Sequence, residues 1–236
     1  MNKLSLSTTS LFVVALLASF SMSSTTSIAQ DDIFSRPSDK DAEKKTDGEA
    51  EAPKASQPAA TSVTKESTAK IEQQSDGWFT VSDDKSLVDV RLPSKPTYKE
   101  ISWSPIAGRK PLVNHLYKSL AKNGQIAVDY SWWDMHQAPA NNKELKDALE
   151  GAVKGSVVNV FGELTRMDKV KSGDAEGREF DFKFTMNLPD GKTPMMSGRS
   201  RVFIKGNRRY QVTVISYAGK EDDDITAKLF DSLLIK

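Results

Sequence analysis

Residues 179–214, which read EFDFKFTMNLPDGKTPMMSGRSRVFIKGNRRYQVTV, carry the strongest structural signal in this 236-residue chain. Large apolar and charged residues alternate from Glu179 to Met186, and this period of two is typical of a half-buried strand. A second alternating run, 199–205, turns at Gly206-Asn207 into a third, 209–214. The three runs predict an antiparallel meander. We expect its buried face to carry Phe180, Phe182, Phe184, Val202, Ile204, Tyr210, Val212 and Val214.

Two shorter runs upstream also have the pattern of strands. Residues 87–92 alternate apolar and polar side chains and stop at Pro93, and residues 98–103 repeat the pattern over a shorter length. Because proline cannot donate to a sheet hydrogen bond, Pro93 marks the end of the first strand.

A hairpin is predicted at Asn123-Gly124, because both positions of the tight turn require a positive φ. The run 125–132 after the turn alternates as a strand. The run 112–120 before it fits either a strand or a helix, since its leucines lie four residues apart. We predict a strand, because the hairpin needs a partner.

Two segments predict helices with one apolar face each. The first begins at Asn141 or Asn142, Gly155 ends or weakens it, and residues 157–161 either extend it or begin the next strand. The second follows the acidic run 221–224, which we interpret as a helix cap because it lacks the spacing of a calcium loop. The pattern predicts an α+β fold, an antiparallel β-sheet of about six or seven strands covered by two main helices.

Residues 1–29 have the pattern of a cleavable signal peptide. Lys3 supplies the positive charge, residues 11–20 the apolar core, and Ser27-Ile28-Ala29 the small residues before cleavage after Ala29. The alternative is an uncleaved anchor, although the apolar core is about half as long as a membrane-spanning helix. The chain contains no cysteine, which excludes a thiol-linked lipid, disulfides and thiolate metal sites. We therefore predict a secreted or periplasmic protein that is not a lipoprotein and has no membrane span after cleavage.

Residues 30–76 are rich in Ala, Ser, Thr, Pro and charged residues. Such a segment buries too little apolar surface to offset the entropy of ordering it, so we predict a disordered low-complexity spacer. It carries 7 basic and 11 acidic residues, whereas residues 77–236 carry 25 basic and 21 acidic ones. The second range has a normal length for one domain, and its small net charge argues against binding of nucleic acid.

The carboxy-terminal half resembles the PsbP-like superfamily, which includes secreted bacterial domains. The resemblance rests on Gly177-Arg178-Glu179 before a strand, on Arg209-Tyr210 in the meander, and on the closing Phe230-Asp231-Ser232-Leu233, where phenylalanine is usual at the last position. It spans residues 77–236, with readable motifs in 176–235. The superfamily includes the extrinsic PsbP subunit of photosystem II and a Ran-binding nuclear import factor. The resemblance therefore implies this fold and a binding or assembly role without catalysis.

Three arginines of the meander, Arg199, Arg201 and Arg209, are candidate contacts for an anionic partner. Arg199 and Arg201 lie on one face of their strand, because alternate residues share a face. Glu179 and Asp181 alternate on the corresponding face of the preceding strand. The arginines are therefore either free for a partner or neutralised in cross-strand ion pairs.

Trp132, Trp133 and His136 form a second candidate surface, where a predicted strand ends and a proline-containing loop begins. Neighbouring residues of a strand point to opposite sides. We therefore expect one indole in the core and the other in contact with a partner, since tryptophan is enriched at binding hot spots.

No motif in the chain identifies a reaction, and we predict no cofactor, no metal site and no enzymatic activity. His115 and His136 lack the spacing of a zinc site, and the motifs of serine hydrolases and nucleotide binders are absent. Our first hypothesis is an exported, non-catalytic domain that binds a protein partner or assists assembly in the cell envelope. The alternatives are a small-ligand or ion-binding protein with a pocket between sheet and helices, and a hydrolase with an unrecognised carboxylate site.

Overall fold

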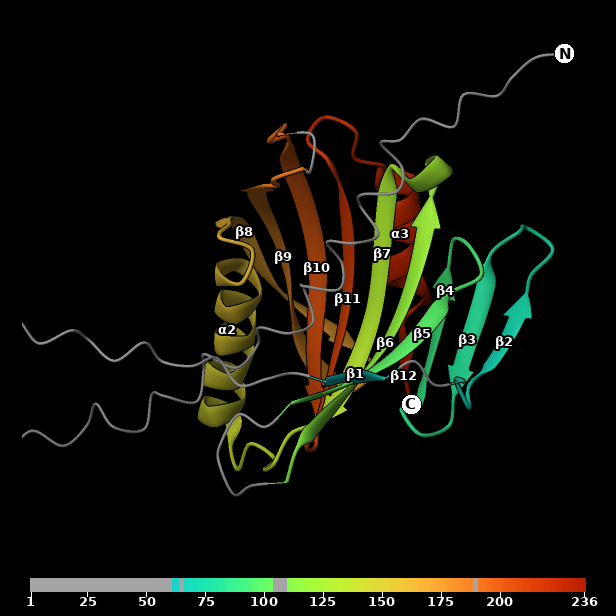
Figure 1. The fold of residues 1–236 in the computed structure, drawn as a ribbon. Helices are drawn as coiled ribbons and strands as arrows, with labels where there is room; N and C mark the ends of the chain where they lie inside the picture. Colours follow the sequence, from blue (N-terminus) through green and yellow to red (C-terminus); the bar gives the residue numbers. More distant parts are fainter. Residues whose placement is uncertain (1–60, 64–65, 104–109, 189–190) are drawn as a thin grey trace, which may run out of the picture.

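The structure is a computed structural model that describes residues 61–63, 66–103, 110–188 and 191–236. The predicted signal peptide, residues 1–29, and most of the predicted spacer lie outside the described residues. Within the described residues, twelve strands form two antiparallel sheets, and two α-helices accompany them (Figure 1). The α+β prediction is confirmed, and the strands divide between two sheets where the sequence predicts one.

The larger sheet has eight strands in the order β1-β5-β6-β7-β11-β10-β9-β8. Its strands are β1 (Thr61–Val63), β5 (Thr97–Trp103), β6 (Leu112–Ala121), β7 (Ile126–Asp134), β8 (Glu163–Ser172), β9 (Ala175–Thr185), β10 (Met195–Lys205) and β11 (Arg208–Tyr217). The predicted meander is confirmed as the three adjacent strands β9, β10 and β11. The predicted hairpin joins β6 to β7, and Asn123 and Gly124 at its turn have φ values of 55° and 84°. The run 112–120 is therefore a strand.

The smaller sheet has four strands in the order β12-β4-β3-β2. Its strands are β2 (Lys70–Gln73), β3 (Phe79–Asp83), β4 (Val88–Leu92) and β12 (Leu234–Ile235). The range predicted as a spacer contains β1 and β2, so its boundary at residue 76 is too late. The sequence KIEQ of β2 holds one large apolar residue and its side chains are largely exposed, so an alternation of buried and exposed positions is missing.

Two amphipathic helices begin where the sequence predicts them. Helix α2 (Asn142–Val158) has Asn141 as its cap, whose side chain accepts a hydrogen bond from the Glu144 backbone amide. Gly155 lies inside this helix, which continues to Val158 before the chain turns. Helix α3 (Asp223–Ser232) begins after Asp222, whose carboxylate accepts a hydrogen bond from the Ile225 amide. The acidic run therefore caps a helix, as its position predicts.

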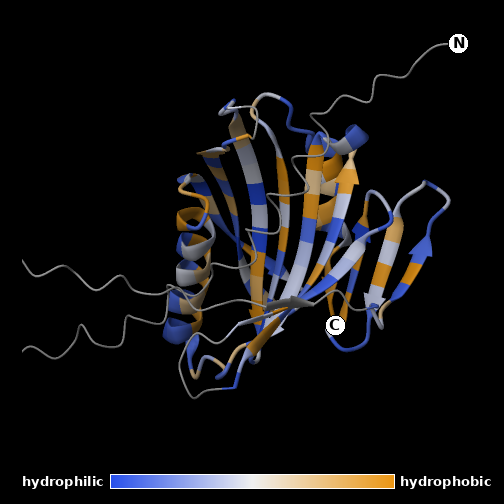
Figure 2. Ribbon diagram, in the orientation of Figure 1, coloured by the Kyte–Doolittle hydropathy of each residue, from blue (hydrophilic) through white to orange (hydrophobic). Residues whose placement is uncertain are grey.

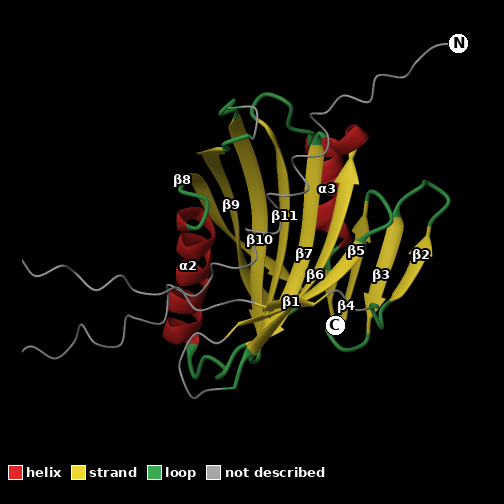
Figure 3. Cartoon of the chain, viewed as in Figure 1, coloured by secondary structure: helices red, strands yellow, loops and turns green. Residues whose placement is uncertain are grey.

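The central strands of the larger sheet are buried on both faces. Helix α2 packs on one face, which we call the α2 face, while α3 and the smaller sheet pack on the other, the α3 face (Figure 3). Both faces of β9, β10 and β11 therefore carry apolar residues. In Figure 2, hydrophobic (orange) and hydrophilic (blue) segments alternate along these strands. The register pairs Val202 with Gln211 and Arg201 with Val212, which fixes the side on which each residue lies.

The predicted buried face of the meander is thus divided between two cores. One group lies on the α2 face and comprises Phe180, Phe182, Phe184, Val202 and Ile204. The other group lies on the α3 face and comprises Tyr210, Val212 and Val214. All eight residues are buried, but the prediction that they share a face is wrong. Alternation within one strand cannot show how the next strand is registered against it.

Two glycines differ sharply in the space around them. A methyl group on Gly177 in β9 would lie 2.5 Å from the Val202 carbonyl oxygen and 2.4 Å from the Phe203 ring. A methyl group on Gly155 in α2 would meet nothing within 4 Å beyond the helix's own backbone. Gly177 therefore permits a close approach between β9 and β10, whereas Gly155 does not need to be glycine.

Replacing each glycine with alanine is expected to change stability in opposite directions. Gly177→Ala lowers the free energy of unfolding by about 2 kcal/mol, because a backbone atom must shift. Gly155→Ala raises it by up to about 1 kcal/mol, since alanine favours the helix interior. Urea denaturation followed by circular dichroism measures both, and equal changes in the two variants would contradict this expectation.

Candidate functional site

The two tryptophans of the predicted aromatic surface point to opposite faces of the larger sheet, and both are buried. Trp132 is 4% exposed and Trp133 is 5% exposed. Trp132 belongs to the core of the α3 face, whereas Trp133 packs with Trp103 at a centroid distance of 6.0 Å. In this structure neither indole presents a surface to a partner, while His136 is exposed in the loop after β7.

Trp132 belongs to a network that joins the two sheets. Its indole nitrogen donates a hydrogen bond to Asp83 Oδ2 at the end of β3, and Tyr117 of β6 donates to the same oxygen, each at 3.2 Å. His115 stacks on the indole with a centroid distance of 3.8 Å. The guanidinium of Arg208 lies 4.6 Å from the centre of the same indole. The network therefore holds the smaller sheet against the larger one.

The predicted arginines Arg199 and Arg201 are neutralised by neighbouring carboxylates. Arg199 Nε donates to Asp181 at 2.9 Å, and Arg201 Nε donates to Glu179 at 2.7 Å. Burial raises the pKa of Glu179, but hydrogen bonds from Arg201 and Arg166 outweigh it and hold this pKa below its ordinary value. The second of the two interpretations, cross-strand pairing, therefore describes these arginines.

Arg209 lies on the α2 face, away from the other two arginines. It is 6% exposed, and its guanidinium lies 4.3 Å from the centre of the Trp133 ring. It donates hydrogen bonds to Gln211 at 2.6 Å and to Ser156 of α2 at 3.4 Å. Burial lowers the pKa of this guanidinium to about 9. The predicted site residues therefore lie on both faces of the sheet and do not form one site.

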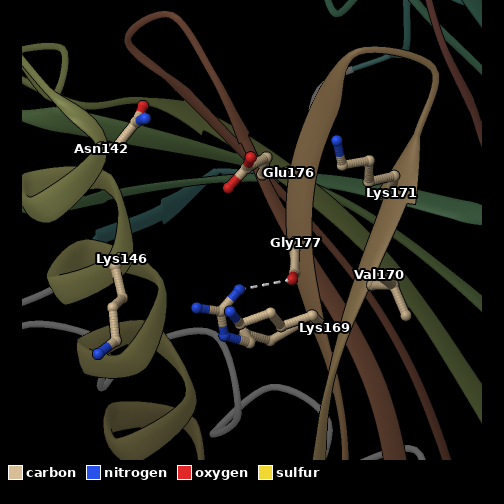
Figure 4. Close-up of a pocket in the computed structure, with 8 residues that line it drawn as sticks. Asn142, Lys146, Lys169, Val170, Lys171, Glu176 and Gly177 are labelled. Carbon is tan, nitrogen blue, oxygen red and sulfur yellow. Dashed lines mark hydrogen bonds between the residues drawn. The ribbon is translucent and has the colours of Figure 1, made fainter.

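A cavity of about 420 Å³ lies between α2 and the hairpin of β8 and β9, a place that none of the predicted sites includes (Figure 4). It is lined by Asn142, Lys146, Lys169, Val170, Lys171, Glu176, Gly177 and Arg178. Four of these side chains are cationic and one is a carboxylate. In Figure 4, Lys169 extends from β8 toward the helix that carries Lys146. The cavity is therefore an open, positively charged hollow of a size found for small-molecule sites.

The cations of the cavity have few close anionic partners among the described residues. Arg178 is 4% exposed, donates to the Gly177 carbonyl oxygen at 2.9 Å, and has Glu150 of α2 at 3.9 Å. Lys146 shares that carboxylate at 3.8 Å. Neither Lys169 nor Lys171 forms an ion pair with any described residue. A guanidinium has five N–H donors, so Arg178 retains donors for an anion.

The sequence contained a signal for this cavity that strand prediction missed. Lys169 and Lys171 alternate on one side of β8, opposite Arg178 and Glu176 of β9. The sequence ELTRMDKVKS of β8 is mostly polar, and its side chains are largely exposed, so its hydrophobic pattern is weak. The PsbP-like resemblance treats Gly177-Arg178-Glu179 as a fold motif. In the structure Gly177 allows the close strand approach, Arg178 lines the cavity and Glu179 neutralises arginines of the opposite face.

Two further features follow from the described part of the chain. Within it, no group of three or more histidine, aspartate or glutamate side chains is arranged to hold a metal ion. Likewise, none of the helices among the described residues has the length and apolar composition needed to cross a membrane.

Comparisons with known proteins place the chain in no family. No family model matches it. No curated protein matches it either. Among solved structures, it is similar to LpqN, a protein involved in cell envelope biogenesis of Mycobacterium tuberculosis, with 16% identity and a TM-score of 0.29. The match covers 75% of this chain and 86% of that chain. A likeness at this level carries no argument about activity, and the PsbP-like assignment remains a resemblance of sequence motifs.

Proposed function

We propose that this protein is a non-catalytic binding protein of the cell envelope that takes an anionic ligand in the cavity between α2 and the β8–β9 hairpin. The observation that carries the proposal is the excess of cationic side chains there, four against one carboxylate. This corresponds to the hypothesis of a ligand pocket between the sheet and a helix. Export rests on the predicted signal peptide, residues 1–29.

The types of side chain favour phosphate-like or carboxylate groups. Arg178 is held in place by burial and by Gly177, so it provides a positioned, planar set of donors that suits such groups. Lys146, Lys169 and Lys171 are exposed, so they contribute positive charge that attracts an anion from solution. The cavity is open, and six of its eight lining residues have polar or charged side chains, which fits a hydrated anionic group better than an apolar molecule.

The hypothesis of a protein partner at the indoles or at Arg199 and Arg201 has less support in the structure. The indoles are buried, and each of these arginines already pairs with a carboxylate. A carboxylate hydrolase would need paired acids in a cleft, whereas the cavity lining contains Glu176 alone. Ligand binding is therefore the function that the described geometry supports best.

Titration with inorganic pyrophosphate tests the proposal, with heat of binding measured by calorimetry. The unmodified protein is expected to bind the probe, and the double variant Lys169→Gln, Lys171→Gln is expected to bind it about tenfold more weakly, since two cations of the cavity are lost. The double variant Lys154→Gln, Lys220→Gln is the matched control, because it removes the same charge from exposed positions outside the cavity lining. Absence of binding in the unmodified protein would overturn the proposal, as would equal weakening in both double variants.

A further inference from the structure

Strand β8 is the edge strand at one end of the larger sheet, so one side of β8 has no partner strand among the described residues. Strand β9 occupies the other edge along residues 163–172. The backbone N–H and C=O groups on the free side can pair with another strand. Ten residues are enough for a pairing that adds a strand to a sheet.

Apolar side chains are exposed at this edge and just before it. Leu164 and Met167 of β8 are each 41% exposed, and Phe161, which precedes the strand, is 96% exposed. Leu164 and Met167 are registered against Phe182 and Phe180, so both lie on the α2 face. The free edge is therefore bordered by an apolar strip on one face of the sheet.

The charges of β8 are complementary to those of a second β8. If two copies pair in antiparallel fashion about Met167, Arg166 of each copy opposes Asp168 of the other, and both side chains lie on the α3 face. Oppositely charged residues that face each other in a sheet attract, and like charges repel. A pairing centred on Arg166 would oppose two arginines, and one centred on Asp168 would oppose two aspartates. Among these neighbouring registers, charge therefore favours the one centred on Met167.

We infer that β8 is the interface of a symmetric dimer, in which two copies of this chain join their larger sheets through antiparallel pairing centred on Met167. Such a contact is isologous and closes after two copies, so it does not propagate into a fibre. A two-fold axis perpendicular to the sheet keeps both α2 helices on the same face. The exposed Met167 side chains of the two copies then face each other on the side of the sheet that carries these helices.

The pairing also explains the composition of this edge. Charged residues on an edge strand usually discourage contact with another chain. In β8 the positive Arg166 and the negative Asp168 instead flank Met167. These charges disfavour pairings centred on either neighbouring residue and favour the pairing centred on Met167. The inference rests on this pattern and on the free edge, and it is independent of the anion proposed for the cavity.

Cysteine cross-linking tests the pairing directly, because the chain has no cysteine of its own. Met167→Cys is expected to form a disulfide-linked dimer under mild oxidation, since directly opposed residues have Cβ atoms about 4.5 to 5.5 Å apart. Thr165→Cys is the matched control, because at this register residue 165 opposes residue 169 rather than itself. Preferential cross-linking of the control would overturn the register.

Sedimentation measurements test the dimer without oxidation. The unmodified protein is expected to be a dimer, and Asp168→Lys is expected to weaken dimerisation by about tenfold or more, because it places a second cation opposite Arg166 of the other copy at two symmetric positions. Asp84→Lys makes the same charge change at an exposed site outside β8 and leaves the dimer intact. A monomer at every concentration, or a dimer unaffected by Asp168→Lys, would overturn the inference.

Discussion

Replacing Lys118 with methionine is expected to lower the free energy of unfolding by about 3 to 5 kcal/mol at neutral pH. Lys118 of β6 and Asp129 of β7 are direct cross-strand neighbours, and the side chain of each is 9% exposed. Their charged atoms are 3.7 Å apart, which is longer than a hydrogen bond. The methionine would leave the Asp129 carboxylate buried without its cation.

The double variant Lys118→Met, Asp129→Leu is expected to recover most of this loss. Removing both charges also removes the cost of taking them out of water, and apolar replacements of buried pairs are often neutral or stabilising. Among the described residues, neither Lys118 Nζ nor Asp129 Oδ1 has a hydrogen-bond partner, so the pair stabilises the fold weakly. Urea denaturation of the four proteins of this double-mutant cycle measures the coupling. A double variant as unstable as the sum of the single variants would contradict this explanation.

The same pair predicts how stability depends on pH. Burial raises the pKa of Asp129 to about 6, so the stability that comes from its bound proton is lost as pH rises through 6. Burial lowers the pKa of Lys118 to about 8, so the stability that comes from its neutral form is lost as pH falls through 8. The two charged forms therefore contribute least to folding between these values. The free energy of unfolding of the double variant, relative to that of the unmodified protein, should be higher at pH 7 than at pH 5.

Replacing Asp83 with alanine is expected to lower the free energy of unfolding by about 3 kcal/mol. Asp83 is 5% exposed and accepts hydrogen bonds from Trp132, from Tyr117 and, at 3.0 Å, from the Lys85 amide. Alanine would leave the buried indole N–H of Trp132 without its acceptor. It would also remove a link between the smaller sheet and two strands of the larger one.

Two further variants separate the hydrogen bonds from other effects. Asp83→Asn keeps one acceptor oxygen, so a smaller loss of about 1 kcal/mol is expected. Asp84→Ala removes an exposed neighbouring carboxylate and should change stability by less than about 0.5 kcal/mol. Denaturant titration followed by tryptophan fluorescence and circular dichroism measures all three variants. A loss in Asp84→Ala as large as that in Asp83→Ala would show that local charge, rather than the buried network, is responsible.

Much of the fold could be predicted because its signals are local. Alternation between residues 179 and 214 identifies the meander, and Asn123-Gly124 identifies a turn that requires a positive φ. Asn141 and Asp222 identify the starts of both helices, since capping depends on the next three residues. Strands β2 and β8 were missed because exposed strands of polar composition have weak hydrophobic alternation.

The candidate site could not be predicted in the same way, because its residues come together across elements. Lys146 comes from α2, Lys169 from β8 and Arg178 from β9. The prediction for Trp132 and Trp133 gave their opposite orientations correctly, but it treated one side of the sheet as exposed. Their burial follows from packing on both faces of the larger sheet, by α3 and the smaller sheet on one side and around Trp103 on the other.

The amino-acid sequence was sufficient for the meander, the main hairpin and the helix starts, since each depends on side chains within a few residues of one another. Strand register, the second sheet and the burial of both tryptophans were decided in three dimensions, because they depend on contacts between distant segments. Whether a charged side chain is neutralised also depends on contacts between distant segments. Carboxylates on the neighbouring strand neutralise Arg199 and Arg201, whereas neither Lys169 nor Lys171 forms an ion pair with a carboxylate of the described residues. Whether a basic residue is free is a property of its neighbours in space.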